Sequence, residues 1–383
     1  MTNNHLLEIK DYGQSIWMDH LNRNLIESGE LQQMIETQGL RGLTSNPAIF
    51  ESAIANNQIY DADIEAGIKA GKSVREIYES LIFEDIRHTC DLFSVIYEES
   101  DGLDGYVSIE VSPHLARDTQ GTIDEALRFY HSLERENVMI KIPGTKEGFP
   151  AIERIISEGI NVNVTLLFSV DSYVNAAWAY IQGLEQRLLK KQPINKIASV
   201  ASFFLSRIDT KIDFYLDERL KEIGTETLSE EARLNQVKGK VAIANAKIAY
   251  QKYKEIIASD RWKRLAEEGA NVQRLLWAST STKNPDYSDV MYVDELIGRD
   301  TVNTLPFNTI EACADHCDPQ GDRLETKIEE AYQLLESLQA ADINIDLDQV
   351  MNELLAEGID KFIQPFDSLM QSLDNKMKQL SPS

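Results

Sequence analysis

The sequence has few cysteines and no long apolar run. Three of its 383 residues are cysteines, Cys90, Cys313 and Cys317, and this odd, sparse set does not form a disulfide framework. No apolar run approaches the ~20 residues of a membrane-spanning helix. The N-terminal segment carries His5 and Glu8 near its few apolar residues and lacks the pattern of a secretory signal peptide. We therefore expect a cytoplasmic protein that does not associate with a membrane.

The sequence also lacks an excess of basic residues and a metal-ligand motif. Its 63 Asp and Glu residues outnumber its 38 Lys and Arg residues, which gives a formal net charge of −25. This charge argues against binding of nucleic acid, so a phosphorylated substrate would need a local basic pocket. Cys313 and Cys317, near His316, provide too few ligands for a metal site and indicate either two small helix residues or a redox pair. We expect neither a metal nor another cofactor.

Short apolar runs alternate with helical patterns through most of the chain. The runs that we interpret as strands cover residues 14–19, 42–47, 105–111, 138–143, 160–168, 198–205, 274–280 and 301–305. The helical patterns between them include 25–38, weakened by Gly29, and 61–98, interrupted near Gly67 and Gly71 with an N-cap at Ser73. Further patterns are a helix opened by a capping box at 122–125 and one from Ser229 to about 257. This alternation predicts an α/β fold, a (β/α)8 TIM barrel. A doubly wound open sheet is the alternative, but no G-x-G-x-x-G follows the first strand.

From about Gly321 the pattern becomes purely helical. One apolar stripe begins at Leu324, and a second begins at Leu354 and is interrupted at Pro365. These apolar faces need to be covered. We therefore predict a catalytic barrel domain over residues 1–320 and a C-terminal helical extension over 321–383 that packs on the barrel.

One predicted strand contains a lysine in an otherwise apolar run. Lys141 lies in Val138–Pro143, where burial would lower its pKa because desolvation disfavours the charged form. A neutral amine attacks carbonyl groups and forms Schiff bases. The stretch alone favours the ordinary alternative, a strand-end lysine whose ammonium reaches solvent.

Other polar residues change that balance. Side chains alternate across a strand, and one parity faces the lumen of a barrel. The residues on that parity near predicted strand ends are Asp19, Glu110, Lys141, Asn163, Thr165, Ser202 and Phe204, and Asn46 ends the second strand. Any single polar residue there is explained as a turn or cap. Together they indicate an active site at the C-terminal face of the barrel.

These groups are suited to covalent chemistry on a carbonyl substrate. We predict that Lys141 is the nucleophile and that Asp19 moves the proton when a carbon–carbon bond breaks. Glu110 and Thr165 are predicted to hold a water for proton transfer.

A second group of residues is predicted to bind the substrate. Asn46 and Asn163 are placed to orient hydroxyl groups. Arg207 and the run from Ser279 to Lys283 indicate a phosphate pocket at the barrel end, although a polar loop explains that run equally well.

Six motifs occur in an order that resembles the transaldolase family. They are Trp17–Asp19, Leu43–Pro47, Val107–Val111, Ile140–Pro143, Asn163–Phe168 and Ser202–Arg207. With the later strands, the resemblance covers roughly residues 14 to 306. The run Trp277–Pro285 resembles the longer bacterial form of the family, which carries additional C-terminal helices.

The resemblance implies a metal-free transferase of the non-oxidative pentose phosphate pathway. We expect a monomer or homodimer, although the sequence does not reveal which. It would transfer a dihydroxyacetone unit from sedoheptulose 7-phosphate or fructose 6-phosphate to glyceraldehyde 3-phosphate or erythrose 4-phosphate. By position, the family's Schiff-base lysine is Lys141, its acid/base carboxylate is Asp19, and its catalytic-water pair is Glu110 and Thr165. Its substrate contacts match Asn46, Asn163, Ser202, Phe204 and Arg207.

The sequence departs from the family at one motif. Shorter transaldolases have Ser-Phe-Arg after the seventh strand, where this chain has Ser281, Thr282 and Lys283. Lysine binds phosphate as a point charge rather than as a planar fork, and Ser279 is an alternative to Ser281. Two other functions stay open: a fructose 6-phosphate aldolase, whose members tend to carry Gln and Tyr in place of Glu110 and Phe204, and a non-catalytic sugar-phosphate-binding barrel.

Overall fold

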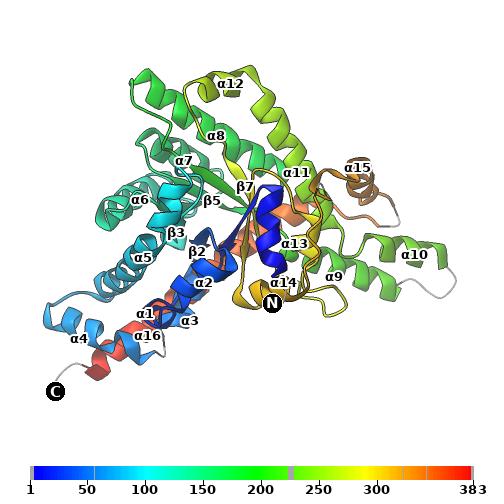
Figure 1. The fold of residues 1–383 in the computed structure, drawn as a ribbon. Helices are drawn as coiled ribbons and strands as arrows, with labels where there is room; N and C mark the ends of the chain where they lie inside the picture. The colour runs from blue at the N-terminus through cyan, green and yellow to red at the C-terminus, as the bar shows by residue number, and fades with distance from the viewer. Residues whose placement is uncertain (1–3, 56, 223–227, 322, 342, 381–383) are drawn as a thin grey trace.

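The computed structural model describes residues 4–55, 57–222, 228–321, 323–341 and 343–380. Eight strands pair in chain order and close into a parallel barrel (Figure 1). They are β1 (Gln14–Met18), β2 (Gly42–Thr44), β3 (Tyr106–Glu110), β4 (Val138–Pro143), β5 (Val162–Leu167), β6 (Ser199–Phe204), β7 (Arg274–Ala278) and β8 (Thr301–Leu305). The predicted (β/α)8 barrel is confirmed.

Helices cover the outside of the barrel and continue beyond β8. Those in the described residues are η1 (His5–Tyr12), α1 (Arg23–Glu27), α2 (Glu30–Gln38), α3 (Pro47–Ile54), η2 (Gln58–Tyr60), α4 (Asp61–Lys69), α5 (Val74–Glu99), η3 (Pro113–Leu115), α6 (Thr119–Leu133), α7 (Gly148–Ser157), α8 (Val170–Leu189), α9 (Ser206–Glu222), α10 (Leu228–Val237), α11 (Val241–Ala258), α12 (Asp260–Glu267), α13 (Met291–Glu295), α14 (Phe307–His316), η4 (Arg323–Glu325), α15 (Ile328–Ser337) and α16 (Leu347–Leu380). None of the helices in the described ranges is both long and apolar enough to cross a membrane.

Two helices that were predicted as continuous are each divided at a glycine. The predicted helix 25–38 consists of α1 and α2, because Gly29 has φ +78°. The predicted helix 229–257 consists of α10 and α11, separated by a turn in which Gly239 has φ +68°. The left-handed backbone that glycine permits ends a helix. Ser229 itself lies in α10, and its predicted role as a cap depends on its side chain, which is not among the side chains that the structure describes.

The predicted capping box at Thr122 and Glu125 is also wrong. Helix α6 begins at Thr119, after the N-cap Asp118 accepts a hydrogen bond from the Gly121 amide at 3.0 Å. Glu125 instead accepts a hydrogen bond from the Ser112 amide at 2.5 Å and fixes the loop after β3. The predicted cap at Ser73 is confirmed, since it forms a reciprocal capping box at the start of α5.

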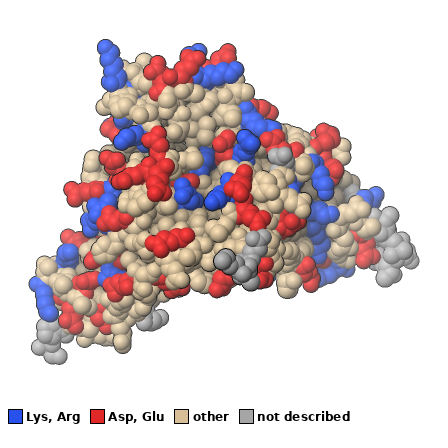
Figure 2. All heavy atoms as spheres, in the orientation of Figure 1, with Lys and Arg blue, Asp and Glu red and all other residues tan. Residues whose placement is uncertain are grey.

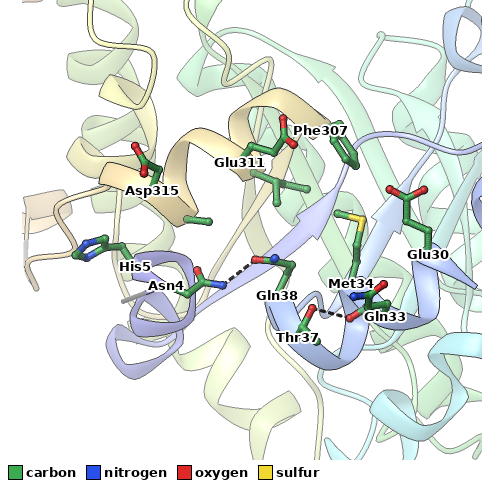
Figure 3. A pocket seen from close by; sticks show the side chains of 12 residues that line it. Asn4, His5, Glu30, Gln33, Met34, Thr37, Gln38, Phe307, Glu311 and Asp315 are labelled. Atoms are coloured by element: carbon green, nitrogen blue, oxygen red, sulfur yellow. Dashed lines mark hydrogen bonds between the residues drawn. The ribbon is translucent and has the colours of Figure 1, made fainter. Parts of the chain in front are cut away.

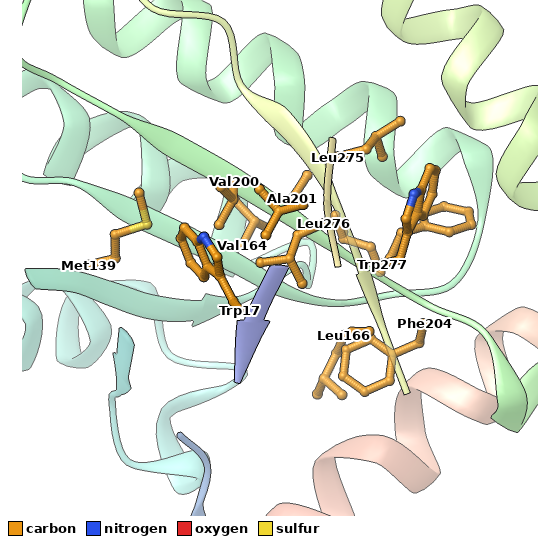
Figure 4. Packing of buried hydrophobic residues seen from close by; sticks show 14 of the residues in the cluster. Trp17, Met139, Val164, Leu166, Val200, Ala201, Phe204, Leu275, Leu276 and Trp277 are labelled. Carbon is orange, nitrogen blue, oxygen red and sulfur yellow. The ribbon is translucent and has the colours of Figure 1, made fainter. Parts of the chain in front are cut away.

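The barrel interior contains an apolar layer and, below it, a buried ion pair. Trp17, Met139 and Leu276 are fully buried (Figure 4). Arg274 donates to Asp104 at 2.9 Å, and Trp17 also donates to Asp104, at 3.1 Å. A Cβ atom at Gly42 would lie 2.6 Å from the Trp17 ring, so glycine makes room for the indole. These contacts fix the N-terminal end of the barrel.

The C-terminal helix α16 is continuous through Pro365, so the predicted interruption there is wrong. Proline removes one hydrogen bond of the helix. Burial of Phe362, Phe366 and Leu369 on either side keeps the helix packed against the barrel domain. Helix α16 contacts α3, α5, α9 and β5 (Figure 1).

Candidate active site

Lys141 is buried at the C-terminal half of β4, with 4% of its surface exposed. Lys141 and Glu110 are register partners on neighbouring strands, and Lys141 Nζ lies 3.8 Å from Glu110 Oε2. The amine also donates to the Ser45 carbonyl oxygen at 3.2 Å. The lysine side chain therefore stays inside the barrel and does not extend to solvent.

The amine opens onto a cavity of about 160 Å³ at this end of the barrel. The cavity is lined by Asp19, Thr44, Asn46, Lys141, Ser202, Phe204, Arg207, Ala278, Ser279, Ser281, Lys283, Thr304, Pro306 and Phe362. It therefore brings together most of the residues that the sequence predicted. Glu110, Asn163 and Thr165 do not line it.

Asp19 follows β1 and is held by a pair of threonines. The Thr44 hydroxyl donates to Asp19 Oδ1 at 2.7 Å and lies 2.7 Å from the Thr304 hydroxyl. The Asp19 amide donates to the Leu305 carbonyl at 2.8 Å. These contacts orient the carboxylate toward the cavity that contains Lys141. Thr44 and Thr304 were not predicted, although each shares the strand parity of the predicted polar residues.

Glu110 is buried beside Lys141 and does not line the cavity. Burial raises the pKa of its carboxyl group to about 7, and the positive charges of Lys141 and Arg207 limit the increase. Among the described residues, neither carboxyl oxygen has a hydrogen-bond partner, and the same is true of the buried Thr165 hydroxyl. Buried polar atoms usually have such a partner, so both groups have unused bonding capacity near the lysine.

Asn163 lies beneath the cavity and joins three strands. Its amide nitrogen donates to the Ser108 hydroxyl on β3 at 3.0 Å. Its amide oxygen accepts from the Ser202 hydroxyl on β6 at 2.6 Å. Asn163 is fully buried, whereas Ser202 lines the cavity. The structure thus places Asn163 where it orients Ser202.

Asn46 both caps helix α3 and lines the cavity. Its side-chain oxygen caps α3 by accepting from the Ile49 amide at 3.0 Å, as expected of an asparagine that ends a strand. The residue also lines the cavity. The cap fixes the orientation of the side chain and leaves its amide NH2 group available.

The cavity lining also carries two cations besides Lys141, which are Arg207 and Lys283. Burial lowers the pKa of Arg207, and the negative charges of Asp19 and Glu110 limit this decrease. Among the described residues, Arg207 Nη1 has no hydrogen-bond partner. Burial and the nearby Arg207 charge lower the pKa of Lys283. Lys283 donates to the Ser281 hydroxyl at 2.7 Å. Two cations and a hydroxyl at one end of a cavity are suited to a phosphate group.

Ser279 is the first residue after β7, and it joins the loop that follows β7 to the start of α9. Its hydroxyl lies 2.7 Å from the Ser206 hydroxyl, and its carbonyl accepts from the Ser206 amide at 3.0 Å. Its φ of +55° turns the chain into the cavity wall. Ser279 and Ser281 both line the cavity, so both alternatives for the second phosphate contact are close to Lys283.

A larger cavity, of about 640 Å³, lies elsewhere, between η1, α2 and α14 (Figure 3). Its lining includes Glu30, Glu311 and Asp315, and none of the described residues that line it is a lysine or arginine, so it is not suited to a phosphate. Over the face shown in Figure 2, Lys and Arg are interspersed with Asp and Glu, which agrees with a local rather than an extended cationic site.

A (β/α)8 barrel with a buried lysine beside carboxyl groups at its C-terminal face has the arrangement of an enzyme that acts on a carbonyl substrate. The sequence profile described as transaldolase/fructose-6-phosphate aldolase matches residues 16–373. The chain is 68% identical over 382 residues to the transaldolase of Trichodesmium erythraeum, and the match covers 100% of both chains. It is 46% identical over 378 residues to the transaldolase of Saccharopolyspora erythraea, with 99% of both chains covered. The protein belongs to the transaldolase/fructose-6-phosphate aldolase family.

Proposed function

We propose that the protein is a transaldolase that transfers a dihydroxyacetone unit between sugar phosphates through a Schiff base on Lys141. Full-length relatives named transaldolase support the activity. The structural observation that carries the mechanism is the position of Lys141: it is buried beside Glu110 and lines a cavity that Arg207 and Lys283 also line.

The reaction begins at the lysine amine. Lys141 Nζ attacks the C2 carbonyl of a ketose phosphate, sedoheptulose 7-phosphate or fructose 6-phosphate, and loss of water leaves an imine. Arg207 and Lys283 bind the phosphate and so set the distance from the phosphate to C2. Ser202 and Asn46 orient the hydroxyl groups between these ends.

Asp19 moves the proton in the bond-breaking step. The carboxylate takes the proton from the C4 hydroxyl as the C3–C4 bond breaks, which releases an aldose phosphate and leaves an enamine on Lys141. Carbon C3 then attacks the aldehyde of glyceraldehyde 3-phosphate or erythrose 4-phosphate, and the aldehyde oxygen takes the proton from Asp19. Thr44 keeps the carboxylate in place through both steps.

Glu110 and Thr165 act on the water that imine formation releases and imine hydrolysis consumes. Their unpartnered oxygens lie next to the lysine strand. A carboxyl group whose pKa is about 7 exchanges protons readily at neutral pH, which suits a group that alternates between acid and base.

Borohydride trapping tests this proposal. Incubation with fructose 6-phosphate and borohydride, followed by peptide mass spectrometry, is expected to show a reduced three-carbon adduct on Lys141. Lys141→Ala should show no adduct and no turnover, with its fold retained in circular dichroism. Turnover in that variant would refute the Schiff-base assignment, and a folded wild-type protein without an adduct would favour a non-catalytic sugar-phosphate-binding barrel.

The acceptor distinguishes transaldolase from fructose 6-phosphate aldolase, the other activity in the family description. With erythrose 4-phosphate present, a transaldolase forms sedoheptulose 7-phosphate, whereas an aldolase releases dihydroxyacetone. We further propose a cytoplasmic monomer or homodimer, with a catalytic domain over residues 1–320 and a helical extension over 321–383. Size-exclusion chromatography with light scattering tests the oligomeric state.

A further inference from the structure

The C-terminal helix α16 places one aromatic side chain, Phe362, in the active-site cavity. The side chain is buried, and its ring centroid lies 5.8 Å from Lys141 Nζ. The same centroid lies 5.8 Å from Arg207 Cζ. The ring is thus close to both the reacting amine and the cationic end of the cavity, and it carries no hydrogen-bonding group.

A close approach between α16 and the barrel mouth brings Phe362 to this position. Gly358 lies one helical turn before Phe362, and a Cβ atom there would be 3.0 Å from Leu166 Cδ2 and 3.5 Å from Arg207 Nη1. Leu166 has φ +58° at a register shift in β5. Bulges near active sites redirect side chains, and this one gives α16 its apolar contact.

Polar contacts fix the helix on both sides of the ring. Lys211 of α9 donates to Glu357 at 2.5 Å and lies 2.8 Å from Glu353 Oε2. Beyond the ring, His114 Nε2 lies 2.7 Å from Asp367 Oδ1. Because α9 also carries Arg207, the Lys211 contacts fix Phe362 relative to the cationic end of the cavity.

We propose that Phe362 determines the fate of the three-carbon unit, by covering the enamine on Lys141 so that it reacts with an acceptor aldehyde before it is protonated from solvent. This inference rests on the proposed function. In transfer, C3 of the enamine bonds to the aldehyde carbon, and the aldehyde oxygen takes the proton held by Asp19. In release, C3 takes that proton or one from solvent instead.

Both routes end with the same hydrolysis: one water adds to the imine, and the free amine of Lys141 is restored. The ring therefore need not exclude every water molecule. It shields the side of the enamine that faces α16 and does not block the approach of the acceptor, while Glu110 and Thr165 belong to β3 and β5. An apolar cover that supplies no proton slows protonation relative to bond formation.

The ratio of dihydroxyacetone released to units transferred tests this role. It is measured for wild type, Phe362→Ala and Phe362→Leu with fructose 6-phosphate and saturating erythrose 4-phosphate. We expect the ratio to rise roughly tenfold or more in Phe362→Ala, because solvent then reaches the enamine. Phe362→Leu retains an apolar side chain and should show a smaller rise. The ratio does not depend on the fraction of enzyme that is folded.

Leu369→Ala is the matched control, since Leu369 is fully buried on the same helix and does not line the cavity. It should lower the melting temperature and leave the ratio unchanged. The inference is overturned if both Phe362 variants trap an adduct on Lys141 and keep the wild-type ratio, or if Leu369→Ala raises the ratio as much as Phe362→Ala. Failure of wild type to trap an adduct would instead refute the proposed function.

Discussion

The carboxyl group of Glu110 links catalysis to stability. Burial raises its pKa from 4.5 to about 7, and the Lys141 charge offsets only part of that effect. Between these two values the folded protein holds a proton that the unfolded chain has released. Stability from this group is therefore fully present below about pH 4.5 and is lost as the pH rises through about 7.

Glu110→Gln removes this titration and keeps the shape of the side chain. From the two pKa values, we expect the variant to gain about 1 kcal/mol over wild type at pH 5 and about 3 kcal/mol at pH 8. Turnover should fall about 100-fold or more, because glutamine cannot exchange a proton. The variant would then be the more stable and the less active protein at neutral pH.

Urea unfolding of both proteins at pH 5 and pH 8 measures the stability difference, and a coupled assay of transfer measures the turnover. The reasoning is refuted if the difference in unfolding free energy between variant and wild type is the same at both pH values. If the stability difference is as expected but turnover is unchanged, the pKa argument holds and Glu110 does not take part in proton transfer.

Three further substitutions separate the other parts of the site. Asp19→Asn should slow cleavage of the C3–C4 bond by about 100-fold or more while imine trapping on Lys141 persists, as stopped-flow and borohydride assays would show; equal losses in both would contradict its proton-transfer role. Lys283→Ala should raise KM for fructose 6-phosphate with little change in kcat, and a kcat effect alone would argue against a phosphate contact. Asp104→Ala should destabilise the fold by about 3–5 kcal/mol, because it leaves the Arg274 charge buried and unpaired. The folded fraction should retain its kcat, and an unchanged urea midpoint would contradict the expected loss of stability.

The strand pattern was predictable because a buried parallel strand is a nearly continuous apolar run. Strands β4 and β8 have the predicted bounds, and the parity argument placed Lys141 and Asp19 at one cavity. The divisions at Gly29 and Gly239 were missed because a glycine inside a helical pattern is often tolerated. Only the positive φ that the tertiary structure imposes makes these residues breakpoints.

Contacts between residues that are distant in the chain could not be predicted from the sequence. Asp104 and Arg274 are 170 residues apart, and no local pattern pairs them. In the sequence, Phe362 is one member of an apolar helix stripe. Its place in the cavity depends on how α16 packs on the barrel. The same holds for Asn163: its strand parity was correct, but the hydrogen bonds to Ser108 and Ser202 decide that it lies beneath the cavity.

The closure of the barrel between β1 and β8 has a consequence for synthesis of the chain. Strand β1 has one register pair with β2, Met18 with Leu43, and a backbone hydrogen bond from the Arg41 amide to the Ile16 carbonyl, whereas its whole length, residues 14–18, pairs with residues 301–305. At about 5–20 residues per second, translation takes roughly fifteen seconds to a minute to make the intervening chain. During that time the first apolar strand has an open edge, which invites pairing with other chains. Newly made chains thus carry this open edge until β8 has been made.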